Sequence, residues 1–115
     1  MPAPVVHFEL RSPDPDATRA FFADLFGWSY GEGGLPGYTY VNTGVGDAIP
    51  GGIGPVQSGE PMTVFFVGVP NVEASLQQAE ELGGRIVQPA TSVPGVTFGI
   101  LADPQGRVVG VAAQD

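Results

Sequence analysis

The pattern of apolar and polar positions along the chain predicts many short elements separated by turns. Apolar residues recur with helical spacing over 15–26 and 71–82. Alternating or continuous apolar runs predict strands at 5–10, 28–30, 38–42, 47–54, 63–69, 85–88, 95–101 and 108–112. The predicted order is one strand, one helix and three strands, followed by the same order again.

Both predicted helices carry start and stop signals. Asp14 is placed as the N-cap of the first helix, and Gly27 follows its last turn. Asn71 is the matching cap of the second helix, which Gly83 and Gly84 end. The two caps are 57 residues apart, which indicates that the chain is one unit written twice.

A second match supports the repeat, because residues 35–40 align with 93–98 at an offset of 58. We therefore expect one domain over 1–115, made of two strand-helix-three-strand modules at about 4–56 and 61–113. The polar segment between them is predicted to be a loop. Whether the modules pair within one chain or between two chains stays open.

One such module is a curled sheet with its helix on the convex side, so its concave face is half of a cavity. Two modules would form an incomplete barrel around a cleft, which is an α+β fold. Strand alternation places His7 and Glu9 toward that cleft, and Val6, Phe8 and Leu10 under the first helix.

In the second module, alternation places Val64 and Phe66 toward the cleft. Tyr38 and Tyr40 share one face of a strand, and Phe98 has the matching position in the second module. Further apolar side chains are expected to pack beneath or along the helices: Phe21, Phe22, Leu25, Phe26, Phe65, Val67, Val69, Val72, Leu76, Ala79 and Leu82.

The charge balance excludes several classes of partner. The chain has 12 acidic residues against four arginines and a net charge of −8, so neither nucleic acid nor an anionic membrane surface is an expected partner. Without cysteine, disulfides, thiolate metal sites and cysteine nucleophiles are excluded. The first residues do not resemble a signal peptide and no apolar run could span a membrane, so we expect a cytoplasmic protein.

Two glycine-rich stretches, 44–46 and 51–54, superficially resemble phosphate-binding loops. Neither is followed by Lys and Ser or Thr, and neither opens a helix after a strand, as such a loop requires. We expect these glycines instead to bend the fourth strand and to allow close approach to its backbone.

Four segments in this order resemble the vicinal oxygen chelate superfamily, which holds glyoxalase I, extradiol dioxygenases and bleomycin-resistance proteins. They are His7-Phe8-Glu9, the helix end over 20–28, the segment 79–84 and the Asp-Pro-Gln-Gly turn at 103–106. The resemblance covers about 5–112 and implies paired modules, a ligand cleft and frequently a homodimer.

The resemblance also implies four metal-ligand positions, two in each module, usually filled by His or Glu. In this chain they fall on His7, near Gly51-Gly52, on Val64 and on Gly110. Only His7 retains a donor, and Glu9 on the same strand could add a second. The sequence therefore predicts that no metal or other cofactor is bound.

His7 and Glu9 are the only candidates for catalysis, since the chain has one histidine and no Gly-x-Ser-x-Gly elbow. The expected role is binding of a small organic molecule, and the acidic charge favours a cationic one. The expected ligand-binding residues are His7, Glu9, Tyr38, Tyr40, Val64, Phe66, Phe98 and Gly110. The alternatives are a metal-dependent or metal-free lyase, isomerase or dioxygenase using His7, and an accessory domain with a filled cleft.

Overall fold

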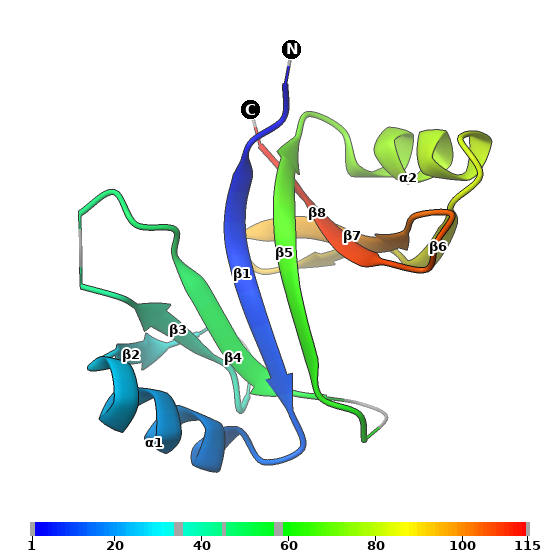
Figure 1. Cartoon of the computed structure of the whole chain (residues 1–115). Helices are drawn as coiled ribbons and strands as arrows, with labels where there is room; N and C mark the ends of the chain where they lie inside the picture. The colour runs from blue at the N-terminus through cyan, green and yellow to red at the C-terminus, as the bar shows by residue number, and fades with distance from the viewer. Residues whose placement is uncertain (1, 34–35, 45, 57–58, 115) are drawn as a thin grey trace. The chain divides into compact units, whose positions relative to one another are not determined.

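A computed structural model describes residues 2–33, 36–44, 46–56 and 59–114. Parts of the 35–40 match, the 44–46 stretch and the predicted loop between the modules lie outside them. The helices are α1 (Pro15–Phe26) and α2 (Val72–Glu81). The strands are β1 (Val5–Ser12), β2 (Ser29–Glu32), β3 (Thr39–Asn42), β4 (Gly51–Pro55), β5 (Met62–Val69), β6 (Arg85–Val93), β7 (Val96–Ala102) and β8 (Val108–Ala113) (Figure 1).

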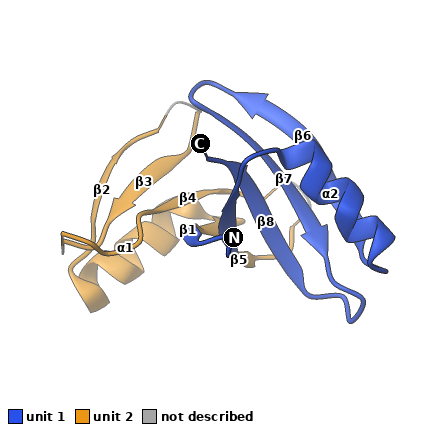
Figure 2. Ribbon diagram, turned by 90° about the horizontal axis from the view of Figure 1, so that it is seen from above, with its two compact units in different colours: residues 1–6, 64–115 blue, residues 7–63 orange. Residues whose placement is uncertain are grey.

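The chain divides into two compact units, coloured separately in Figure 2. Unit 2 is 7–63 and holds most of β1 with α1, β2, β3 and β4. Unit 1 joins 1–6 to 64–115 and holds most of β5 with α2, β6, β7 and β8. The α+β class and the repeated strand-helix-three-strand order predicted from the sequence are confirmed.

In unit 2 the strand order is β2-β3-β4-β1. β1 is parallel to β4, whereas β3 is antiparallel to both β4 and β2. The register sets Gly52 of β4 opposite Glu9 on one side and Tyr40 on the other. These three residues therefore form one row across three neighbouring strands.

Unit 1 repeats this arrangement with the order β5-β8-β7-β6. β5 is parallel to β8, and β7 is antiparallel to both β8 and β6. Its register pairs Phe66 with Gly110 and Phe98 with Ala112. The buried core joins this sheet to α2 through Val69, Val72, Leu76 and Val111.

Both helices start as their caps predict. The Asp14 carboxylate accepts a hydrogen bond from Ala17 N at 3.1 Å, and the Asn71 side chain accepts one from Ala74 N at 2.9 Å. Gly27 ends α1 with a φ of 73°, in the left-handed region that glycine adopts without strain.

Replacing either cap should destabilise the protein by a similar amount. We expect Asp14→Ala and Asn71→Ala each to lower the free energy of unfolding by about 1 kcal/mol, because each leaves a helix N–H without its acceptor. Urea unfolding measures the change. Asp24→Ala, an exposed substitution within α1, is the control and should change stability by less than about 0.5 kcal/mol.

The expected burial was wrong for part of both helices and for one strand residue. Phe21, Leu25 and Phe26 are 59%, 57% and 57% exposed, so these side chains of α1 do not form core. Leu82 is 72% exposed because it lies at the C-cap of α2, past the last turn. Phe65 is 45% exposed and lies outside the apolar core around α2.

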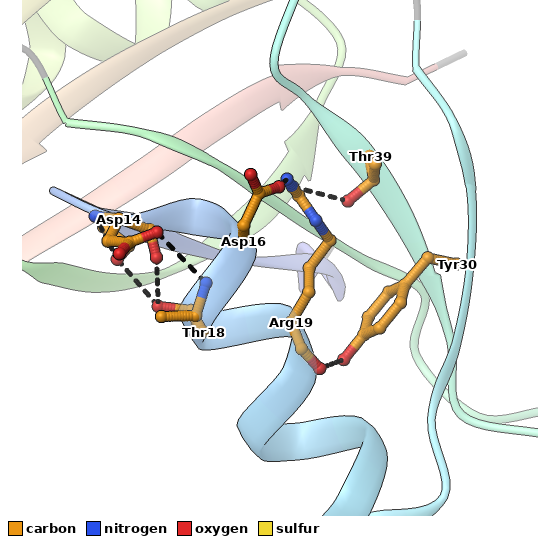
Figure 3. Close-up of polar contacts among 8 residues, drawn as sticks. Asp14, Asp16, Thr18, Arg19, Tyr30 and Thr39 are labelled. Carbon is orange, nitrogen blue, oxygen red and sulfur yellow. Dashed lines mark hydrogen bonds and ion pairs between the residues drawn. The ribbon is translucent and has the colours of Figure 1, made fainter.

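Arg19 is one difference between α1 and α2. It is the repeat counterpart of Leu76, whose side chain α2 buries in the core. The Arg19 guanidinium instead pairs with Asp16 and donates to the Thr39 hydroxyl at 3.3 Å (Figure 3). A charged side chain thus stands where α2 has a core leucine, and α1 has no fully buried side chain.

Aromatic rings form the contact beneath α1 instead. Trp28 lies 5.3 Å from the Phe22 ring and 5.6 Å from the Phe8 ring, centroid to centroid. Phe8 therefore lies on the α1 side of β1, as alternation predicted.

No helix among the described residues is long and apolar enough to cross a membrane.

Candidate functional site

A polar cluster occupies the face of unit 2 that points away from α1. The Tyr38 hydroxyl lies 3.2 Å from His7 Nε2 and donates to Glu9 Oε1 over the same distance. His7 Nε2 and Glu9 Oε1 are themselves 3.8 Å apart. The phenol therefore bridges the two residues that the sequence predicted to face a cleft.

Arg11 holds the second oxygen of the Glu9 carboxylate. Its Nε donates to Glu9 Oε2 at 2.6 Å, and the two side chains are only 19% and 12% exposed. Burial raises the pKa of Glu9, but the hydrogen bonds and charges of His7 and Arg11 outweigh burial, so the pKa lies below its ordinary value. Glu9 is therefore a carboxylate at neutral pH.

Strand alternation explains why these side chains meet. Successive side chains of a strand point to opposite faces, so His7, Glu9 and Arg11 of β1 share one face. Tyr38 directly precedes β3 and reaches across β4 to them. Tyr40 lies on the same face, 50% exposed, with its ring edge-on to Tyr38 at 5.6 Å.

Glycines of β4 make room for the Tyr38 ring. A Cβ at Gly52 would lie 1.8 Å from the Tyr38 hydroxyl oxygen, and one at Gly54 would lie 2.9 Å from the ring. A Cβ at Gly33 would lie 2.4 Å from the opposite ring edge. The close backbone approach predicted for the 51–54 stretch is confirmed: Tyr38 approaches at Gly52 and Gly54, and Phe8 approaches at Gly51.

The Tyr38 phenol is held in its protonated form. Burial, followed by the charge and hydrogen bond of Glu9, raises its pKa well above the ordinary value of 10.0. Tyr38 also lines an open pocket of about 420 Å³ near the β2–β3 connection, which Arg19 and Thr39 line as well. One side chain thus belongs to both the polar cluster and the pocket.

The other predicted site residues lie in unit 1. Val64 and Phe66 are buried, at 2% and 4% exposed. The Phe66 ring covers Gly110, where a Cβ would lie 2.4 Å from ring carbons, and Phe98 packs edge-on at 6.1 Å. Phe66, Phe98 and Gly110 therefore lie together in unit 1.

Arg11, Gly52 and Gly54 were not among the ligand-binding residues expected from the sequence. Arg11 continues the alternation of His7 and Glu9, so the face on which it lies could be predicted from the sequence. Its ion pair with Glu9 depends on side-chain geometry and could not. The role of the two glycines depends on the register that brings Tyr38 over β4.

A family model described as a glyoxalase-like domain matches residues 7–112. The chain belongs to this family. Two proteins named "Putative glyoxylase CFP32", from Mycobacterium bovis and Mycobacterium tuberculosis, are 26% identical to this glyoxalase-like chain over 113 residues. The match covers 90% of this chain and 42% of each relative, so the chain spans about two fifths of the relatives' length.

Solved structures show the same fold. A glyoxalase/bleomycin resistance protein/dioxygenase superfamily member from Vibrio splendidus 12B01 superposes with a TM-score of 0.65 at 17% identity, over 98% of this chain and 100% of its own. Methylmalonyl-CoA epimerase from Mycobacterium tuberculosis gives 0.66 at 13% identity, over 96% and 87%. Together with the family match over residues 7–112, these structures confirm the resemblance to the vicinal oxygen chelate superfamily.

The residues present do not fit the metal that some members of the superfamily hold. At two of the expected ligand positions, Gly52 and Gly110, the space for a donor side chain is filled by Tyr38 and Phe66. Val64 at the third is apolar and 2% exposed. Within the described ranges, no three His, Cys, Asp or Glu side chains group closely enough to hold a metal ion.

The Glu9 interactions predict how stability depends on pH. Because the folded pKa lies below the ordinary 4.5, the folded state binds fewer protons. The contribution of the Glu9 interactions to the free energy of unfolding is complete above the ordinary pKa of 4.5, and it is lost as the pH falls through the folded pKa. We expect the stability difference between the native chain and Glu9→Gln, from urea unfolding, to be largest near about pH 7 and to shrink towards about pH 3. A stability difference that stays constant across this pH range would contradict the lowered pKa of Glu9 in the folded state.

Proposed function

We propose that this glyoxalase-like chain binds a small organic molecule, without a metal ion, on the face of unit 2 that carries His7, Glu9, Tyr38 and Tyr40. The observation that carries the proposal is the Tyr38 hydroxyl held between His7 and Glu9. Ligand sites commonly combine aromatic walls with a few fixed polar groups. The Tyr38 and Tyr40 rings supply the walls here, and His7 and Glu9 supply the polar groups.

Exposure also supports this face. Tyr40 is half exposed and the His7 side chain is 23% exposed, so a ligand can reach both. The open pocket near the β2–β3 connection shares only Tyr38 with this face, so it does not carry the proposal.

A cationic ligand remains the favoured class. The chain carries a net charge of −8, which concentrates cations around it. Arg11 already balances the charge of Glu9, so this attraction is a property of the whole chain. The affinity for a cation should therefore fall as salt is added, and affinity independent of salt would contradict this part of the proposal.

A compound screen by protein-observed NMR tests the proposal. The probes are drug-sized cationic, neutral and anionic compounds, with bleomycin among the cations, added to isotope-labelled protein in EDTA. We expect binders to shift resonances of His7, Glu9, Tyr38 and Tyr40, and Tyr38→Phe to weaken them. Tyr30→Phe is the matched control, because the Tyr30 hydroxyl bonds the Arg19 carbonyl beside α1. A screen in which no compound shifts these resonances would overturn the proposal.

The screen also separates binding from catalysis. Any binder that is converted to a product should be retested with His7→Ala. Loss of turnover with retained binding would assign the chain to the metal-free enzymes of its superfamily. Weaker binding without turnover in either protein supports a binding role.

A further inference from the structure

The directions of the hydrogen bonds around Tyr38 determine which ring nitrogen of His7 carries the proton. A carboxylate can only accept hydrogen bonds, so the Tyr38 hydroxyl donates its single proton to Glu9 Oε1. The same hydroxyl oxygen lies 3.2 Å from His7 Nε2. Since its proton is already used, the oxygen can only accept there, and Nε2 must be the N–H donor.

We propose that Tyr38 is a positioning residue that keeps a proton on Nε2 of His7, so that the neutral ring is the Nε2–H tautomer. Nδ1 is then the unprotonated nitrogen of the neutral ring. The inference goes beyond the proposed function, because it concerns the protein without a ligand.

The contact of Arg11 with Glu9 favours the same direction of hydrogen bonding, from His7 to Tyr38 and from Tyr38 to Glu9. Arg11 Nε fixes Oε2 at 2.6 Å, which leaves Oε1 turned to the phenol. In the other tautomer, Nε2 would need the phenol proton, and the nearly buried carboxylate would lose that bond. Because a hydrogen bond to a charged group is at stake, we expect the Nε2–H tautomer to be favoured by about tenfold or more.

The experiment reads the tautomer directly, because His7 is the only histidine in the chain. Long-range ¹H–¹⁵N correlation spectra of labelled protein, at a pH where the ring is neutral, distinguish a pyrrole-like from a pyridine-like nitrogen. We expect a pyrrole-like Nε2 and a pyridine-like Nδ1. Tyr38→Phe should move both resonances towards a mixture of tautomers, and Tyr30→Phe should leave them unchanged.

A wild-type protein with the proton on Nδ1 overturns the inference, and this result does not depend on whether any variant folds. Unchanged resonances in a folded Tyr38→Phe overturn it as well. The tautomer is read without ligand, so the two proposals fail separately. If no compound in the screen binds, the proposed function is wrong and the tautomer assignment is unaffected. If compounds bind but the neutral His7 ring carries its proton on Nδ1, only the tautomer inference is wrong.

Discussion

Gly52→Ala should lower the free energy of unfolding by roughly 1–3 kcal/mol, the usual cost of overpacking a filled space. The added Cβ would lie 1.8 Å from the Tyr38 hydroxyl oxygen and 2.3 Å from the carbon that carries it. Tyr38 must therefore leave its place between His7 and Glu9, and both of its hydrogen bonds are lost. Urea unfolding measures the stability, and the His7 ring resonances report whether the phenol has moved.

Gly31→Ala is the matched control for this substitution. Gly31 also lies in a strand of unit 2, but nothing lies within 4 Å of a Cβ placed there. Because alanine restricts the unfolded chain more than glycine does, we expect this change to be neutral or slightly stabilising. If the two variants unfold at the same urea concentration, the close contact between Gly52 and Tyr38 is wrong.

Leu76→Ala should cost more, about 2–5 kcal/mol, because it leaves a cavity in a packed core. Leu76 is 2% exposed and belongs to the apolar cluster that joins α2 to the sheet of unit 1. The surrounding side chains Val69, Val72 and Val111 are all buried, so the space is not easily refilled. Thermal or urea unfolding gives the loss.

Leu25→Ala removes the same atoms from the other helix. Leu25 is 57% exposed, and α1 has no fully buried side chain. We expect a loss below about 1 kcal/mol, since most of the deleted surface already faces water. If Leu76→Ala and Leu25→Ala lower the free energy of unfolding equally, the difference in burial between α1 and α2 is contradicted.

Local signals were enough to predict much of the fold. Asp14 and Asn71 cap the helices that they were predicted to cap, because a cap depends on residues three positions away. Burial on α1 was not predictable in this way. Apolar spacing placed Phe21 and Phe26 in the core, but Arg19 occupies the position that Leu76 has in α2.

The site could be predicted only as far as single strands allow. Alternation placed His7 and Glu9 on one face, and the structure confirms that they lie together. The bridge by Tyr38 depends on the pairing of β3 with β4 and on glycine at position 52, which link segments distant in sequence. The ion pair of Arg11 with Glu9 likewise depends on the side-chain conformations within β1.

Tyr38 is proposed to organise a metal-free site for a small organic molecule. Calorimetric titration of the tightest compound from the screen, with and without EDTA, tests it most directly. We predict one dissociation constant in both buffers, weakened by about tenfold in Tyr38→Phe and unchanged in Tyr30→Phe, because the phenol contributes a hydrogen bond to a charged network. Binding that disappears in EDTA, or that Tyr38→Phe leaves at full strength, would contradict the account.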